Sequence, residues 1–136
     1  MRNILVVGHG QFSSGLYSAA KFFMSNHEKL RFIDAFTSEE SLDDQIAQYF
    51  SKMSATDTVV ILTDIISGST TQKCFVYAQR PNCFLITGIN LPLLIELLRS
   101  EENIPSAAQL NELIDLSRNA MTLIDPEQVI YEDGDE

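Results

Sequence analysis

The sequence contains few basic residues and only two cysteines. Nine Lys and Arg stand against 19 Asp and Glu among the 136 residues, which gives a formal net charge of −10. No basic run is present that could neutralise a row of phosphates, so we expect neither nucleic acid nor an anionic membrane surface as a partner. Cys74 and Cys83 form no C-x-x-C motif, and two thiols are too few for a disulfide framework or a typical metal centre.

The chain also lacks a long hydrophobic run. The first apolar segment, Ile4 to Val7, is shorter than the core of a signal peptide. The most apolar later stretch, Leu85 to Leu98, is interrupted by glycine, asparagine, proline and glutamate, so it does not read as a membrane span. We therefore expect a cytoplasmic protein that does not insert into a membrane.

Apolar residues are nevertheless sufficient for one folded domain. Hydrophobic residues make up 45 % of the chain and its mean hydropathy is +0.01, which excludes disordered and collagen-like classes. Six of the 19 acidic residues follow residue 124. The sequence thus predicts a domain body over residues 1–124 and a C-terminal segment over residues 125–136, with a short strand at 128–131 and an acidic tail.

Apolar runs and helical spacings alternate along the body. The runs predict strands over residues 4–7, 30–36, 58–63 and 83–87. The spacings predict helices over residues 13–25, 38–50, 69–79, 91–99 and 106–121. This order predicts an α/β fold with an open, mostly parallel sheet and helices on both faces.

Two of these helices carry additional local signals. Residues 37–40 read T-S-E-E, which is the pattern of a capping box at the start of the second helix. In the last helix, Leu110, Leu113, Ile114 and Met121 have the spacing of a buried face.

Ligands in open parallel sheets bind at the carboxyl ends of the strands. In this sequence the first strand ends in Gly8-His9-Gly10, the third ends at Asp64, and the fourth is followed by Gly88-Ile89-Asn90. We therefore look for the functional site among these three loops.

Known nucleotide and metal motifs do not fit these loops. The G-x-G at Gly8 to Gly10 has Ser13 in place of the third glycine of a dinucleotide fingerprint. Gly10 and Gly15 have the separation of a P-loop, but Leu16-Tyr17 stands where Lys and Ser or Thr are needed. His9 and His27 are the only histidines, so we expect no metal site and no cofactor.

His9 is placed to react. It lies between two glycines directly after a buried strand, and Asp64 can reach one of its ring nitrogens from the neighbouring strand, which leaves the other nitrogen nucleophilic. Ser67-Gly68-Ser69-Thr70 then leads into the third helix and offers hydroxyls, backbone amides and a helix N-terminus to an oxyanion. Taken singly, His9 could be a turn residue, Asp64 an incidental acid and Ser69 a helix cap. Their shared position favours a phosphoryl group carried by His9.

These motifs resemble those of the mannose-type IIA component of the bacterial phosphoenolpyruvate-dependent sugar phosphotransferase system (PTS). The resemblance rests on Gly8-His9-Gly10 after an apolar strand, on Thr63-Asp64 followed by Gly68-Ser69, and on Gly88 to Pro92. It implies that His9 accepts a phosphoryl group from the histidine-containing phosphocarrier protein and passes it to a IIB component. It also implies that Asp64 pairs with this histidine.

The resemblance also implies roles for the surrounding loops. Gly10, Gln11, Ser67, Gly68 and Ser69 are expected to bind the phosphoryl group. The family's Gly-Gly-Ser-Pro loop differs here, because serine replaces its first glycine and threonine replaces its proline.

Partner contacts and assembly are further implications of the resemblance. Asn90 and Pro92 are expected to contact a partner protein. The family's homodimers exchange a C-terminal strand, a role that residues 128–131 could fill.

Two other functions remain open from the sequence. One is the related phosphotransfer subunit of a dihydroxyacetone kinase, which shares the fold and the position of the histidine. The other is a flavodoxin-like module that binds a small ligand without catalysis.

Overall fold

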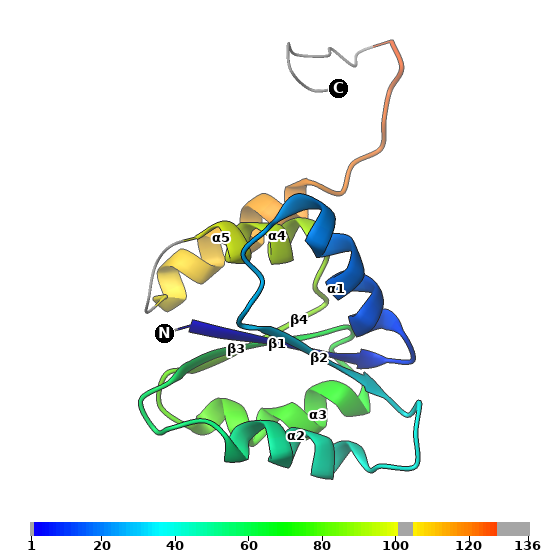
Figure 1. Cartoon of the computed structure of the whole chain (residues 1–136). Helices are drawn as coiled ribbons and strands as arrows, with labels where there is room; N and C mark the ends of the chain where they lie inside the picture. The colour runs from blue at the N-terminus through cyan, green and yellow to red at the C-terminus, as the bar shows by residue number, and fades with distance from the viewer. Residues whose placement is uncertain (1, 101–104, 128–136) are drawn as a thin grey trace.

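The computed structural model describes residues 2–100 and 105–127, and within them four parallel strands form one sheet in the order β2-β1-β3-β4 (Figure 1). The strands are β1 (Arg2–His9), β2 (Leu30–Ala35), β3 (Thr58–Thr63) and β4 (Cys83–Thr87). The helices are α1 (Phe12–Phe23), α2 (Leu42–Ser51), α3 (Ser69–Phe75), α4 (Leu91–Arg99) and α5 (Ala107–Asn119), with a short 3₁₀ helix, η1 (Tyr77–Gln79), after α3. The predicted α/β class and parallel sheet are confirmed.

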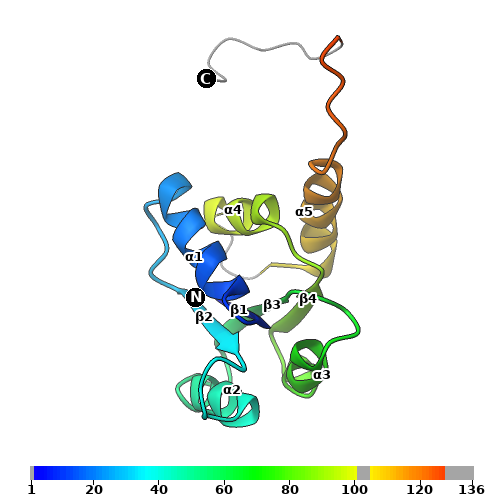
Figure 2. The same cartoon turned by 90° about the vertical axis from the view of Figure 1, so that its right-hand side faces the viewer.

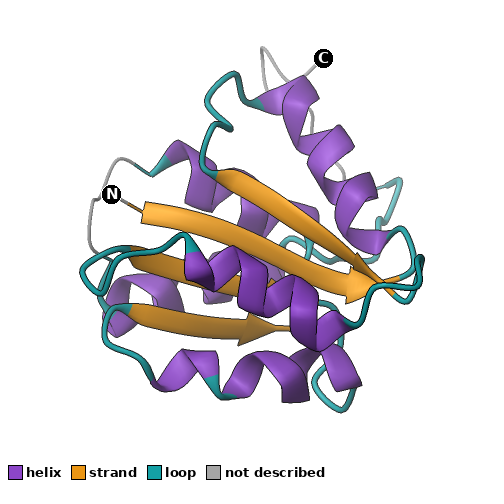
Figure 3. Cartoon of the chain, turned by 60° about the horizontal axis from the view of Figure 1, so that its bottom comes forward, coloured by secondary structure: helices purple, strands orange, loops and turns teal. Residues whose placement is uncertain are grey.

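Helices cover both faces of the sheet. α2 and α3 lie on one face, and α1, α4 and α5 lie on the other (Figure 2). Figure 3 shows that all four strands point the same way, so that their carboxyl ends meet at one edge of the sheet. No helix in the described ranges is both long and apolar enough to cross a membrane.

The two faces of the sheet build two cores. Side chains alternate along β1, so Leu5 and Val7 pack with Ile46 of α2, whereas Val6 packs with Leu94 of α4 on the opposite face. All six residues of β3 are buried, as expected for a strand covered by helices on both faces. Each large aliphatic side chain buried in this way contributes about 1.5–3 kcal/mol.

The start of α2 differs from the prediction. Ser41, and not Thr37, is the N-cap residue, because the Ser41 hydroxyl accepts a hydrogen bond of 3.1 Å from the backbone N–H of Asp44. The Thr37 hydroxyl donates instead to the Asp34 carbonyl oxygen at 2.8 Å. The predicted capping box at 37–40 is therefore wrong; the later start still buries Leu42 as the first helical residue.

The predicted third helix is split. It ends at Phe75 and is followed by η1, rather than running unbroken to Gln79. The four strands predicted in the domain body and the helix over residues 91–99 are confirmed to within a few residues at their ends.

The last helix begins as predicted but ends earlier. Ser106 caps α5 in a reciprocal pair with Gln109, and Leu110 is buried. α5 ends at Asn119, and Met121 is 82 % exposed because the chain there leaves the domain body (Figure 2). The prediction of a core position for Met121 is therefore wrong. The predicted strand at 128–131 lies outside the described residues.

Candidate active site at the carboxyl ends of β1 and β3

The sheet topology brings His9 and Asp64 together. β1 and β3 are neighbours, and their parallel register pairs Val7 with Thr63. His9 is the last residue of β1 and Asp64 directly follows β3, so both side chains lie at the carboxyl edge of the sheet. This is the juxtaposition that the sequence predicted.

One oxygen of Asp64 holds His9 at two points. Oδ2 accepts a hydrogen bond of 2.8 Å from the backbone N–H of His9 and lies 2.8 Å from Nδ1 of its ring. The two contacts fix both the backbone and the orientation of the imidazole. The histidine side chain is 44 % exposed and the aspartate side chain is 12 % exposed, so the ring faces solvent while its partner is mostly covered.

The second oxygen of Asp64 is also fully engaged. Oδ1 accepts hydrogen bonds from the backbone N–H of Ile65 at 3.0 Å and from the hydroxyl of the buried Thr70 at 2.8 Å. Partial burial acts to raise the pKa of Asp64, but the hydrogen bonds from His9 and Thr70 outweigh it and hold this pKa below its usual value.

The state of Asp64 fixes the tautomer of His9. An ionised carboxylate can only accept hydrogen bonds, so we assign the ring hydrogen of the neutral imidazole to Nδ1. Nε2 then carries the lone pair and is the nitrogen available to an electrophile.

Gly68 lies against the histidine ring. A Cβ atom at this position would lie 2.9 Å from Cε1 of His9 and 2.8 Å from Cγ2 of Ile65, closer than unbonded carbons can approach. Gly68 is the N-cap residue of α3, and Ser69 is the first residue of the helix. Ser69 is therefore not the helix cap, which was the alternative to a functional role for it. Gly68 brings its loop directly beside the imidazole.

The turn after His9 is shaped by Gly10. Its φ angle of +57° lies in the left-handed region that glycine adopts without strain. Its backbone N–H donates to the Ala35 carbonyl oxygen at 3.0 Å, which ties the turn to the end of β2. The exposed Gln11 follows as the N-cap residue of α1.

Asn90 has an internal role at the start of α4. Its Oδ1 accepts from the backbone N–H of Leu93 at 3.0 Å, and its Nδ2 donates to the Ser117 carbonyl oxygen at 2.8 Å. The side chain therefore caps α4 and connects it to α5. Pro92 is exposed on the first turn of α4. Partner contact at these two residues stays a prediction.

The sequence did not predict the contacts that two further residues make in this site. The Thr70 hydroxyl was expected to face a bound oxyanion, but it donates to Asp64 instead. Phe36 has a φ angle of +66° and places its ring centroid 5.5 Å from that of His9, with 59 % of the residue exposed. A polar residue directly after the Ser-Gly-Ser loop was a signal for Thr70, whereas no local pattern marks Phe36.

The remaining reactive groups give no second centre of this kind. Among residues 2–100 and 105–127, no group of three His, Cys, Asp or Glu side chains could hold a metal ion. Cys74 is buried, and burial raises the pKa of its thiol to about 12, so this thiol is protonated at neutral pH.

Comparisons with known proteins identify a family and a shared fold. A family model described as "PTS system fructose IIA component" matches residues 3–115. A comparison with curated proteins gave no match.

Solved structures share the fold over most of their length. A Klebsiella pneumoniae protein described as a permease of the phosphoenolpyruvate-dependent sugar PTS is 24 % identical, with 90 % of each chain covered and a TM-score of 0.84. The PTS IIA protein associated with the fucose utilization operon from Streptococcus pneumoniae is 25 % identical, with 93 % of this chain and 94 % of that chain covered and a TM-score of 0.74. The mannose/sorbose specific IIA subunit from Enterococcus faecalis is 14 % identical, with 95 % and 98 % covered and a TM-score of 0.80.

Proposed function

Since this chain belongs to the family of fructose- and mannose-type IIA components of the PTS, we propose that it is a phosphoryl carrier in which Nε2 of His9 holds the phosphoryl group. The observation that carries the proposal is the contact of 2.8 Å between Asp64 Oδ2 and Nδ1 of an exposed histidine. This contact leaves Nε2 unprotonated and accessible at the edge of the sheet where ligands of such folds bind.

The transfer step follows from this tautomer. The Nε2 lone pair attacks phosphorus in line, and the bond between phosphorus and the donor's histidine nitrogen breaks as the new N–P bond forms. The hydrogen on Nδ1 stays on the ring. The phosphorylated imidazole becomes positively charged, and the Asp64 carboxylate stabilises that charge through the same hydrogen bond.

The loops beside His9 supply groups for the phosphoryl oxygens. Gly10 and Gln11 follow the histidine directly, and Gly68 lies against its ring. The N–H groups of the first turn of a helix have no acceptor within that helix, so Ser69 at the start of α3 can offer its amide. The Ser67 and Ser69 hydroxyls are further donors. These groups would meet the developing charge without reorganisation.

The partners follow from the family. The histidine-containing phosphocarrier protein is the proposed donor, and a IIB component is the proposed acceptor in coupled sugar uptake. Both exchanges take place in the cytoplasm. The protein acts as a homodimer, which is supported by the exposed apolar residues Met121, Leu123 and Ile124 on the segment that leaves the body.

Phosphoryl transfer from phosphoenolpyruvate tests the proposal. The full chain is incubated with radiolabelled phosphoenolpyruvate and the general PTS proteins, then with candidate IIB proteins. We expect one phosphate per chain that is labile in acid and stable in base, and its loss on addition of the matching IIB protein. Label that is absent, or that passes only to a nucleotide-dependent dihydroxyacetone kinase, would reject the role of the chain as a IIA carrier.

A further inference from the structure

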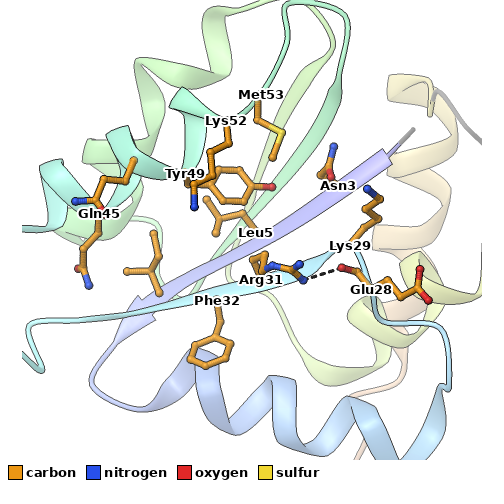
Figure 4. A pocket seen from close by; sticks show the side chains of 12 residues that line it. Asn3, Leu5, Glu28, Lys29, Arg31, Phe32, Gln45, Tyr49, Lys52 and Met53 are labelled. Atoms are coloured by element: carbon orange, nitrogen blue, oxygen red, sulfur yellow. Dashed lines mark hydrogen bonds between the residues drawn. The ribbon is translucent and has the colours of Figure 1, made fainter.

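A pocket lies beside the edge strand β2, on the face of the sheet that α2 covers. It is an open cavity of about 430 Å³ between the edge strand β2 and the helix α2 (Figure 4). Its lining includes Asn3 and Leu5, near the start of β1, whereas His9 ends the same strand. The lining ends at Ile33, which pairs with Val7 of β1, and it includes neither His9 nor Asp64. The cavity is thus separate from the site of phosphoryl transfer.

The pocket gathers positive charge in an acidic protein. Lys29, Arg31 and Lys52 line it, whereas Glu28 supplies its only carboxylate in the described part of the chain. Neither lysine forms an ion pair with a described residue. The Arg31 guanidinium is fixed by Nη1, which donates to the carbonyl oxygens of Glu28 at 2.7 Å and of Leu30 at 2.9 Å, and its other N–H groups remain as donors.

Two buried polar atoms of the lining have no hydrogen-bond partner among the described residues. They are Oη of Tyr49 and Oε1 of Gln45, both on α2. Buried polar atoms are nearly always paired, so such atoms on a cavity wall call for an explanation. Burial raises the pKa of Tyr49, so its hydroxyl is a donor at neutral pH, whereas Gln45 Oε1 is an acceptor.

The floor of the pocket is apolar. Leu5 and Ile33 come from the sheet, and Met53 follows α2. Figure 4 shows Tyr49 and Lys52 on the α2 side of the pocket and Arg31 and Lys29 on the β2 side, so the polar groups come from both walls. The volume of the cavity, about 430 Å³, lies within the range of small-molecule sites, roughly 300–1,000 Å³.

We propose that this pocket binds a small polyol that carries a phosphate group. Lys29, Arg31 and Lys52 would bind the phosphate, and the Tyr49 hydroxyl would donate to one of its oxygens. Gln45 Oε1 requires a hydrogen-bond donor, and a hydroxyl group of the polyol can supply it. The proposal does not depend on the chemistry of His9.

Calorimetric titration of the full chain tests the proposal with three probes: glucose 6-phosphate, inorganic phosphate and glucose. We expect glucose 6-phosphate to bind with a dissociation constant below about 1 mM, and the other two probes to bind at least about tenfold more weakly. Amide chemical shifts should change around Tyr49 and Arg31, and not around His9. The His9→Ala variant should bind glucose 6-phosphate as the unaltered chain does, which separates this site from the site of phosphoryl transfer.

Matched variants identify the groups responsible. Tyr49→Phe keeps the ring and removes the hydroxyl, and the double variant Lys29→Gln, Lys52→Gln removes two exposed charges; each should weaken binding of glucose 6-phosphate at least about tenfold. Lys21→Gln removes a charge on α1, outside this pocket, and should leave binding unchanged.

Three outcomes would overturn the proposal. They are the absence of saturable binding, shift changes centred on His9, and equal affinity for glucose 6-phosphate and inorganic phosphate, which would mean an adventitious ion only. Phosphorylation of His9 should proceed normally in the lysine double variant, so failure here is distinguishable from failure of the proposed carrier function.

Discussion

The orientation of His9 depends on one carboxylate, and each of the two oxygens of that carboxylate makes two polar contacts. Asp64 orients the imidazole through Oδ2 and is itself held by Thr70 and Ile65 through Oδ1. A residue so constrained positions its neighbour more precisely than a freely rotating side chain can.

Replacing the proposed phosphoryl acceptor tests the assignment most directly. We expect His9→Ala to abolish phosphoryl acceptance and to leave the thermal unfolding temperature nearly unchanged, because the side chain is 44 % exposed and lies at a loop. Acid-labile label and thermal melting measure the two effects. His27→Ala is the matched control and should retain full acceptance; loss of label in this variant instead would refute the assignment of His9.

Replacing the carboxylate should slow the reaction. We expect Asp64→Asn to reduce the rate of phosphoryl transfer by roughly 10- to 100-fold, on the scale known for partners that orient metal-binding histidines, while the circular dichroism spectrum stays that of a folded protein. Asp43→Asn, which removes only an exposed ion pair with Lys73, should leave the rate unchanged. A normal rate in Asp64→Asn would remove Asp64 from the site.

Stability should reveal the lowered pKa of Asp64. Because the folded-state pKa lies below the unfolded value of about 3.9, the carboxylate contributes stability that is complete above about pH 4 and is lost as the pH falls through the folded-state pKa. The difference in the free energy of unfolding between the unaltered chain and Asp64→Asn should therefore shrink on acidification below pH ~4. Urea unfolding at several pH values measures this difference, and a difference that stays constant with pH would contradict the prediction.

At the scale of the elements, the site depends on the adjacency of β1 and β3 and on the loop that leads into α3. Both strands are almost wholly buried, so their carboxyl ends are fixed in space relative to one another. The loop before α3 is less constrained by the core. The lack of a side chain at Gly68 allows this loop to approach the imidazole of His9 closely.

Adding a methyl group to that loop should disturb the histidine. We expect Gly68→Ala to slow phosphoryl transfer at least about tenfold, because the new Cβ would displace the His9 ring from its contact with Asp64. Gly15→Ala is the matched control: Gly15 lies within α1, and a Cβ there meets no atom within 4 Å. It should preserve the rate and raise stability by about 0.5–1 kcal/mol. Equal rates of phosphoryl transfer in both variants would show that close contact between Gly68 and the His9 ring is not needed for the reaction.

At the scale of the whole molecule, the C-terminal segment connects the domain to its proposed assembly. Leu123 is 96 % exposed and Met121 is 82 % exposed, and exposed apolar side chains of this kind are the surface that the proposed dimer would cover. Exchange of a terminal element is a common route to a dimer.

Truncation tests this assembly. We expect the full chain to sediment as a dimer at micromolar concentration, and the chain shortened after Ile124 to become monomeric or to aggregate, because a sheet edge and apolar surface lose their cover. Sedimentation velocity of both forms is the measurement. A full-length monomer would reject the dimer and leave the chemistry of His9 untouched.

The sequence alone determined the class of the fold and the identity of the central residues. Four buried strands and the spacing of α4 are continuous local patterns, since burial on both faces requires an unbroken apolar run and a helix requires a repeat of 3.6 residues. The pair of His9 and Asp64 was also predictable, because parallel strands end at one edge of the sheet. The family that these motifs predicted is confirmed by the match over residues 3–115.

Only the tertiary structure decided which side chains surround His9 and where α2 begins. The hydrogen bonds from Thr70 and the ring of Phe36 depend on how loops from β2 and β3 converge on His9, and no spacing in one segment encodes the distance to another. The cap of α2 shifted to Ser41 because several nearby polar residues could serve as caps, and packing of the helix against the sheet selected one. The charged pocket between β2 and α2 likewise exists only because residues 29–31 and 45–52 pack side by side.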